Sequence, residues 1–93
     1  MSARRALVTG ASSGIGEAVT RLLAAEGYRV ALLARNRERL DAIAAELPEC
    51  ADGPHVVLPC DLTDFASIEA SLGELDAAFG GLDLLVNNAG IGY

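Results

Sequence analysis

Short apolar runs alternate along this chain with stretches in which apolar residues recur every three or four positions. The runs predict four β-strands, and the stretches between them predict three α-helices with one apolar face each. The predicted strands are residues 5–8, 28–34, 55–58 and 82–86, and the predicted helices are residues 14–26, 37–47 and 64–79. Strands that alternate with helices in this way are typical of βαβ units, which share one parallel sheet.

Connections between parallel strands are right-handed, and this rule decides how four such strands are ordered. It predicts an α/β fold with a doubly wound parallel sheet that ends after strand 4, in the order 3-2-1-4. At 93 residues the chain forms one domain at most. The fourth strand is then an open apolar edge, which favours association unless further strands pair with it.

The helical spacing also predicts which residues reach the core. These are Ile15, Val19, Leu22 and Leu23 in the first helix, Leu40, Ile43, Ala44 and Leu47 in the second, and Ile68, Leu72, Leu75 and Phe79 in the third. Thr63 is predicted to cap the start of the third helix, with Asp64 favourably placed against the helix dipole.

The charge balance limits the partners of the chain. Thirteen acids against seven bases give a net charge of −6, which opposes the phosphates of a nucleic acid. All seven bases are arginines within the first 39 residues, so an anion site has to be built near the front. The longest apolar stretch, residues 30–34, is too short for a signal peptide or a membrane span. We expect a soluble cytoplasmic chain with no nucleic-acid or membrane partner, and reduced thiols at Cys50 and Cys60.

A glycine-rich junction follows the first predicted strand, where residues 9–16 read TGASSGIG. Glycines at positions 10, 14 and 16 let the backbone pass close to a diphosphate. The N–H groups and the dipole of the helix that follows favour its negative charge. The spacing is G-x-x-x-G-x-G, a variant of the general dinucleotide pattern G-x-G-x-x-G. A flexible turn with a close contact between helix and strand is the alternative interpretation.

Residues 87–90 read NNAG and follow the fourth predicted strand. Together with TGASSGIG they resemble the short-chain dehydrogenase/reductase family, whose pattern is Thr-Gly-x-x-x-Gly-x-Gly and Asn-Asn-Ala-Gly. The resemblance covers the whole chain and implies a Rossmann-like fold with a dinucleotide cofactor. The residues that it implies beside the phosphates are Gly10, Ser12, Ser13, Gly14, Ile15 and Gly16. Those that it implies beside the riboses are Asn88, Ala89 and Gly90, although taken alone residues 87–90 also fit a polar turn.

The end of the second predicted strand bears on the choice of cofactor. An acid at this position accepts the ribose 2′-hydroxyl of NAD(H), whereas an arginine accepts the 2′-phosphate of NADP(H). Here Ala34 occupies the position of the acid and Arg35 follows, with Arg37 and Arg39 nearby. We therefore expect NADP(H) rather than NAD(H). A solvent-exposed Arg35 at a helix start is the alternative, and family members that use NADP often have a second base where this chain has Ser13.

Asp61-Leu62-Thr63 follows the third predicted strand and resembles the adenine-binding step of the family. The resemblance implies that Asp61 accepts a hydrogen bond from the exocyclic amine and that the backbone of Leu62 meets the ring. Because Thr63 and Asp64 already serve the helix start, we expect the Asp61 side chain to be free for the ligand. The single histidine, His55, is interpreted as a polar residue at a strand end.

The resemblance implies hydride transfer between a nicotinamide and an alcohol or carbonyl substrate, with a tyrosine as general acid/base and a lysine four residues further on. Both lie after Asn-Asn-Ala-Gly in the family. This chain has no lysine, so no Tyr-x-x-x-Lys can be formed and we expect no catalytic residue and little turnover. We interpret residues 1–93 as the N-terminal dinucleotide-binding half of a single Rossmann-like domain in an NADP(H)-dependent oxidoreductase.

Two other interpretations remain open. The first is a non-catalytic remnant that binds a dinucleotide or dimerises. The second is a glycine loop for another adenosine ligand, as in methyltransferases, where an acid rather than Ala34-Arg35 is expected after the second strand. The substrate and a homo-oligomeric state are left open as well.

Overall fold

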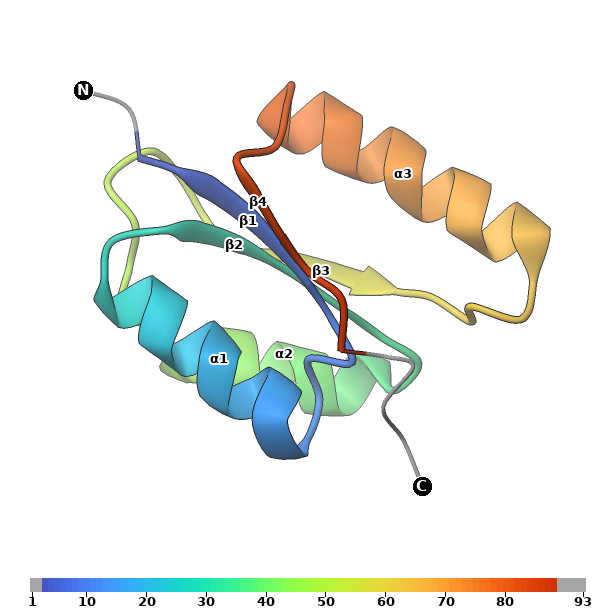
Figure 1. Ribbon diagram of the computed structural model, residues 1–93, viewed down its shortest axis with the longest axis horizontal. Coiled ribbons are helices and arrows are strands. Elements are labelled where there is room, and N and C mark those ends of the chain that lie inside the picture. Colours follow the sequence, from blue (N-terminus) through green and yellow to red (C-terminus); the bar gives the residue numbers. More distant parts are fainter. Residues whose placement is uncertain (1–2, 89–93) are drawn as a thin grey trace.

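One parallel four-stranded sheet lies between two helices on one face and a third helix on the other (Figure 1). The computed structural model describes residues 3–88. In chain order the elements are β1 (Arg5–Thr9), α1 (Gly14–Ala25), β2 (Arg29–Ala34), α2 (Arg37–Glu46), β3 (Val56–Pro59), α3 (Phe65–Phe79) and β4 (Leu84–Val86). The strand order is β3-β2-β1-β4 with every pair parallel, which confirms the predicted fold. The element bounds differ from the predicted ones by one or two residues.

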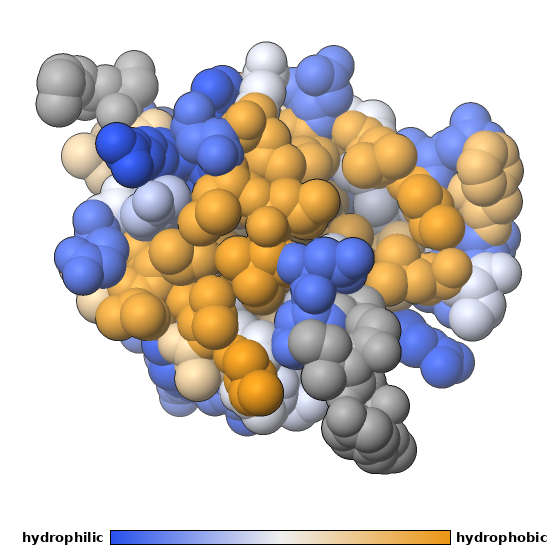
Figure 2. Space-filling view, viewed as in Figure 1, coloured by the Kyte–Doolittle hydropathy of each residue, from blue (hydrophilic) through white to orange (hydrophobic). Residues whose placement is uncertain are grey.

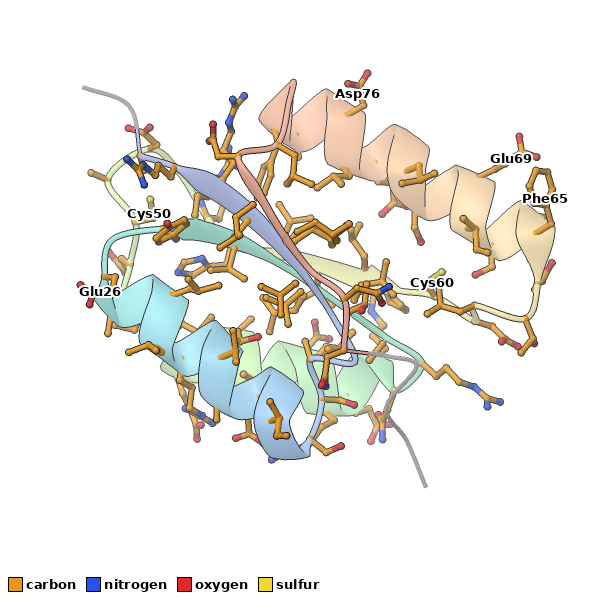
Figure 3. All side chains as sticks on the ribbon, viewed as in Figure 1. Glu26, Cys50, Cys60, Phe65, Glu69 and Asp76 are labelled. Atoms are coloured by element: carbon orange, nitrogen blue, oxygen red, sulfur yellow. The ribbon has the colours of Figure 1, made fainter. Side chains whose placement is uncertain are left out.

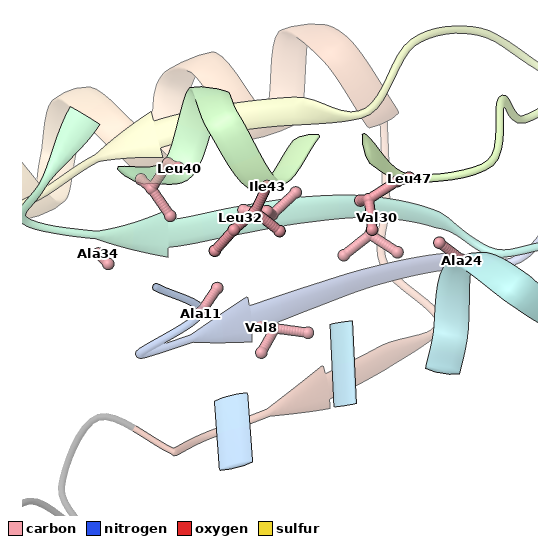
Figure 4. Close-up of a cluster of buried hydrophobic side chains, with 9 residues drawn as sticks. All are labelled: Val8, Ala11, Ala24, Val30, Leu32, Ala34, Leu40, Ile43 and Leu47. Atoms are coloured by element: carbon pink, nitrogen blue, oxygen red, sulfur yellow. The ribbon is translucent and has the colours of Figure 1, made fainter. Parts of the chain in front are cut away.

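The core has two layers because successive residues of a strand face opposite sides of the sheet. On the side of α1 and α2 the buried cluster comprises Val8, Ala11, Ala24, Val30, Leu32, Ala34, Leu40, Ile43 and Leu47 (Figure 4). On the side of α3 it comprises Leu7, Ala31, Leu33, Leu58, Cys60, Leu75 and Phe79. Strand β2 contributes to both layers, and its last five residues are all buried. This accounts for its continuous apolar sequence.

The packing face of α1 differs from the predicted one. Ile15 and Leu22 are 65% and 62% exposed, whereas the residues that α1 buries are Gly16, Thr20 and Ala24. These three are small and recur every four positions, so the helix can approach the sheet closely. The Thr20 hydroxyl donates a hydrogen bond to the Gly16 carbonyl at 2.8 Å, which satisfies its polar group inside the core.

The other two helices follow their predicted faces more closely. In α2, Leu40 and Ile43 are fully buried, and Leu47 just beyond its end is 7% exposed. In α3, Leu75 and Phe79 are buried as predicted, but Leu72 is 52% exposed. The prediction for Leu72 was therefore wrong.

The start of α3 corrects another prediction. Its N-cap is Asp64, whose side chain accepts a hydrogen bond from the Ala66 amide at 3.1 Å, and not Thr63. The Thr63 hydroxyl instead donates to Asp61 Oδ1 at 2.6 Å. Only one of the two neighbouring polar residues, Asp64, is therefore used as the cap. The residue after it, Phe65, begins α3 and points away from the sheet in Figure 3.

Two arginines bind the other end of α3. Arg29 Nη1 donates to the Ala78 carbonyl at 3.1 Å, and Arg5 Nη1 donates to the Phe79 carbonyl at 2.9 Å. The Arg29 guanidinium also lies over the Phe79 ring, 4.9 Å from its centre. Positive charge at the carboxyl end of a helix complements its dipole, so these contacts fix α3 against the sheet.

His55 has the structural role expected of a polar residue at a strand end. Its Nδ1 accepts a hydrogen bond from the Val30 amide at 3.0 Å, so Nε2 carries the proton and donates to the Pro48 carbonyl at 2.7 Å. Cys50 and Cys60 are both free thiols.

Apolar side chains gather around β4, and they continue onto both sides of it in Figure 2. Leu85 in this strand is 56% exposed, and Leu82 just before it is 39% exposed. Within residues 3–88, β4 pairs only with β1, which leaves the predicted open edge. None of the helices in the same range is long and apolar enough to span a bilayer.

Candidate functional site

The carboxyl ends of the four strands meet at one edge of the sheet. The segments that leave this edge are residues 10–13, 35–36, 60–64 and 87–88. Strand order reverses between β1 and β4, because the chain passes from β1 to β2 on one side and returns to β4 on the other. In open parallel sheets, ligands bind in the crevice outside such a switch point. Residues 10–13 and 87–88 flank it.

The three glycines of the first segment are needed for two different reasons. Gly10 and Gly14 have φ angles of 63° and 57°, in the left-handed region that favours glycine. Gly16 is buried, and a Cβ there would overlap the Gly10 carbonyl oxygen and lie 2.8 Å from Asn88 Nδ2. The loop backbone therefore packs directly on the first turn of α1.

The amino end of α1 presents unused hydrogen-bond donors. Ser13 is the N-cap residue, but its side chain makes no capping hydrogen bond. Within residues 3–88, the backbone N–H groups of Gly14, Ile15 and Gly16 have no hydrogen-bond acceptor. Ser13, Gly14 and Ile15 are exposed, and Ser12 is half-buried. This donor set fits a diphosphate, because free amides and the helix dipole both favour negative charge.

Thr9 joins the two sequence motifs. The Asn88 amide donates to Thr9 Oγ1 at 2.8 Å, and Thr9 Oγ1 lies 3.1 Å from Asn87 Oδ1. Asn88 Nδ2 also donates to the Gly10 carbonyl at 3.4 Å. The structure thus brings Asn88 against the glycine loop, while Ala89 and Gly90 lie outside the described residues. Sequence reasoning assigned no role to Thr9 or Asn87, although their places at the carboxyl ends of adjacent strands are a usable signal.

The three arginines after β2 differ in what they contact. Arg35 is exposed and, among residues 3–88, makes no hydrogen bond or ion pair. Arg37 pairs with Asp41 one turn later on α2, at 3.7 Å. Arg39 Nε donates to the Ser12 carbonyl at 3.1 Å, and its Nη2 lies 2.6 Å from Glu17 Oε1. Of the three, Arg35 is the one whose guanidinium makes no hydrogen bond or ion pair within the described part of the chain.

Asp61 follows β3, and Arg35 follows β2, the neighbouring strand in the sheet. Its Oδ1 accepts hydrogen bonds from the Thr63 hydroxyl at 2.6 Å and the Thr63 amide at 2.9 Å. These two bonds lower the pKa of Asp61, and the positive charge of Arg35 adds to the effect. The expectation of a free Asp61 side chain was wrong for this oxygen, because Thr63 does not cap α3. Leu62, the next residue, is 42% exposed.

A parallel sheet with a glycine loop and an open helix terminus at its switch point defines a Rossmann-like α/β protein. The sequence pattern of the family described as short chain dehydrogenase matches residues 4–93. The chain belongs to the short-chain dehydrogenase/reductase family.

Several relatives support this assignment. The chain is 48% identical over 86 residues to farnesol dehydrogenase of Aedes aegypti, a match that covers 92% of the chain and 35% of that protein. The crystal structure of L-sorbose reductase from Gluconobacter frateurii with NADPH and L-sorbose matches with a TM-score of 0.86 and 36% identity, over 100% of this chain and 35% of that one. The 3-ketoacyl-(acyl-carrier-protein) reductase of Brucella melitensis with NADH gives a TM-score of 0.78 and 26% identity, over 90% and 33%. The chain spans about a third of the length of the curated relatives it matches.

Proposed function

We propose that this chain is the NADP(H)-binding part of an oxidoreductase that transfers hydride between the nicotinamide and an alcohol or carbonyl substrate. Residues 1–93 would form the N-terminal half of a single Rossmann-like domain. The observation that carries the proposal is the pairing of open amides at the start of α1 with an unengaged Arg35 at the end of β2. Both are donors for phosphate, and they lie at the same edge of the sheet.

Each residue of the proposed site has a stated task. The residues that hold the diphosphate are Gly10, Ser12, Ser13, Gly14, Ile15 and Gly16. Arg35 binds the 2′-phosphate, and Asp61 and Leu62 hold the adenine. Those beside the riboses are Asn88, Ala89 and Gly90. When bound, NADP(H) supplies or accepts the hydride, and these residues orient it at the switch point.

The proton donor of the reaction is proposed to lie outside residues 1–93, since the chain has no lysine and no Tyr-x-x-x-Lys. Reading the DNA downstream of the codon for Tyr93 tests this point. A continuous frame that encodes Tyr-x-x-x-Lys is expected. A stop codon at that place would instead favour a protein that binds a dinucleotide without turnover. We further propose a cytoplasmic location, which the free thiols at Cys50 and Cys60 support.

The preference for NADP(H) rests on Arg35 and on the lack of an acid at Ala34. The structure of L-sorbose reductase contains NADPH and that of the Brucella melitensis reductase contains NADH, so the relatives do not decide between the two cofactors. The argument for NADP(H) therefore depends on the residues of this chain. Free Arg35 favours a 2′-phosphate, and an aspartate in its place would repel one and accept the 2′-hydroxyl.

Titrations of NADPH and NADH, followed by nicotinamide fluorescence, test this preference. A charge-assisted hydrogen bond contributes about 1.5–3 kcal/mol, so Arg35→Ala is expected to weaken NADPH binding by roughly 10- to 150-fold and to leave NADH nearly unchanged. Arg35→Asp is expected to reverse the preference. Arg37→Ala is the matched control, because it removes an exposed arginine two residues away. An unchanged ratio of the two affinities in Arg35→Asp would show that Arg35 does not meet the 2′-phosphate.

A further inference from the structure

Arg39 connects α2 to the glycine loop through one contact and to the start of α1 through another. Its Nε donates a hydrogen bond to the Ser12 carbonyl at 3.1 Å. Its Nη2 donates to Glu17 Oε1 at 2.6 Å. Ser12 belongs to the loop itself, and Glu17 lies in the first turn of α1. One guanidinium therefore contacts both the loop and the helix start that are proposed to receive the diphosphate.

The contact with Ser12 bears on the direction of a backbone carbonyl. An oxygen that pointed into the diphosphate site would place a negative partial charge beside the phosphates. Because the Ser12 carbonyl accepts a hydrogen bond from the Arg39 guanidinium, it points toward α2. The N–H groups at the start of α1 are then the backbone groups that remain available to the anion. Arg39 is thus placed to select the loop conformation that exposes donors.

The contact with Glu17 bears on charge. Glu17 is an acid close to the proposed diphosphate, and its side chain is only 21% exposed. Hydrogen bonds and charge from Arg21 and Arg39 lower its pKa, so it stays ionised at neutral pH. Arg21 in turn lies 2.6 Å from Glu46 Oε1, so it is shared between two acids. Without Arg39, the carboxylate of Glu17 would be less compensated and would repel a diphosphate more strongly.

We propose that Arg39 is a positioning residue for the diphosphate of the cofactor, acting through the Ser12 carbonyl and through Glu17 and not by touching the ligand. The inference rests on the proposed function and assigns the two arginines different parts: Arg35 recognises the 2′-phosphate, and Arg39 shapes the loop that receives the diphosphate.

Three probes separate these parts. ADP-ribose contains the diphosphate without a 2′-phosphate, adenosine 2′-monophosphate contains the 2′-phosphate without the diphosphate, and NADPH contains both. Isothermal titration measures the affinity of each for the unaltered protein and for Arg39→Ala, Arg39→Lys and Arg37→Ala. Arg37→Ala removes the same charge from the same helix, but among the described residues the Arg37 guanidinium pairs only with Asp41. Circular dichroism and thermal unfolding verify that each variant is folded.

Arg39→Ala is expected to weaken ADP-ribose and NADPH about tenfold each, while adenosine 2′-monophosphate changes less than twofold. Arg39→Lys is expected to recover only part of the loss, because an ammonium cannot make both contacts with the geometry of a guanidinium. Glu17→Gln in the Arg39→Ala background removes the uncompensated charge and is expected to restore part of the affinity. Should Arg39→Ala fail to fold, Arg39→Lys provides the same comparison of probes.

Three results would overturn the inference. The first is that Arg39→Ala and Arg37→Ala lose equal affinity for ADP-ribose. The second is that Arg39→Ala loses as much affinity for adenosine 2′-monophosphate as for ADP-ribose. The third is that Arg39→Ala loses no affinity for any of the probes. The second result would make Arg39 a ligand of the 2′-phosphate. Failure of the unaltered protein to bind NADPH and ADP-ribose would instead refute the proposed function, and the inference with it.

Discussion

The same substitution at two helical glycines is expected to change stability in opposite directions. Gly16 in α1 and Gly73 in α3 both lie inside helices, where alanine is intrinsically favoured by roughly 0.5–1 kcal/mol. A Cβ at Gly73 meets no atom within 4 Å, whereas a Cβ at Gly16 would overlap the Gly10 carbonyl oxygen and lie 2.7 Å from its carbon. Only the surroundings distinguish the two positions.

The size of the effect at Gly16 follows from what has to move. Overpacking a filled site costs typically about 1–3 kcal/mol. Here the obstacle is backbone, and it belongs to a loop that the Ala11 amide fixes to the Leu33 carbonyl and that Asn88 fixes through Gly10. We take a value near the upper end, about 3 kcal/mol, less about 1 kcal/mol for helix propensity. Gly16→Ala is therefore expected to destabilise the protein by about 2 kcal/mol.

Unfolding by urea and by heat, followed by far-ultraviolet circular dichroism, measures both variants. For a domain of this size 1 kcal/mol corresponds to roughly 4–8 °C, so Gly16→Ala is expected to lower Tm by roughly 8–16 °C. Gly73→Ala is expected to raise it by roughly 2–8 °C, as an open helical position should. If Gly16→Ala were as stable as the unaltered protein within about 0.5 kcal/mol, the close packing of the loop on α1 would be refuted.

Two further expectations concern other contacts at the sheet edges. Thr9→Val deprives the Asn88 amide of its acceptor and is expected to lower the free energy of unfolding in urea by about 1–2 kcal/mol. Thr9→Ser keeps the hydroxyl and is expected to stay within about 0.5 kcal/mol of the unaltered protein. Equal losses of stability in the two variants would show that the hydrogen bonds are not the cause. Hydrogen bonds from the amide and side chain of Arg5 lower the pKa of Asp83 below 3.8, so the stability they add is complete above that pH and is lost as the pH falls through the lowered pKa. Asp83→Asn is therefore expected to flatten the acid side of the stability profile. The control is Asp76→Asn, because Asp76 is an exposed acid of α3 whose side chain makes no hydrogen bond or ion pair among residues 3–88. Parallel profiles for the unaltered protein and Asp83→Asn would contradict this.

The arrangement of the strands was predictable because it depends on few quantities. Strand length and helical spacing indicate alternating strands and helices, right-handed connections restrict the possible orders, and the order 3-2-1-4 is the one that the family resemblance implies. The continuous apolar run of β2 is typical of a parallel strand that is buried on both faces, and the last five residues of β2 are all buried. The glycine pattern likewise placed a tight loop after β1, because positive φ angles such as those of Gly10 and Gly14 favour glycine strongly.

The packing face of α1 was not predictable from hydropathy, because volume decides it. Ile15 and Leu22 are the more apolar residues, yet Gly16, Thr20 and Ala24 face the sheet. Small side chains allow a closer approach of helix and sheet than large ones do, and a hydropathy pattern does not contain that information.

The start of α3 was missed because two neighbouring residues were both competent caps. Thr63 and Asp64 each have a side-chain acceptor, and sequence preferences rank them closely. The choice is made by Asp61, whose Oδ1 accepts hydrogen bonds from the amide and the hydroxyl of Thr63. The same turn then determines how much of the Asp61 carboxylate is left for a ligand. A local competition between side chains therefore decides both the cap and the candidate adenine contact.

The different contacts of Arg37 and Arg39 could not be separated by sequence. Its place directly after Ala34 singled out Arg35, but Arg37 and Arg39 have the same charge, and the pattern assigns them only a positive potential nearby. Helix geometry separates them, because α2 begins at Arg37 and turns Arg39 toward Ser12 and Glu17 of the first βα unit. Arg35 precedes the helix, and its side chain makes no hydrogen bond or ion pair among residues 3–88, although its positive charge acts on Asp61. In the proposed site, a phosphate would meet the Arg35 guanidinium beside a loop that Arg39 holds in place. Such an arrangement would discriminate between phosphates by position and not by charge alone.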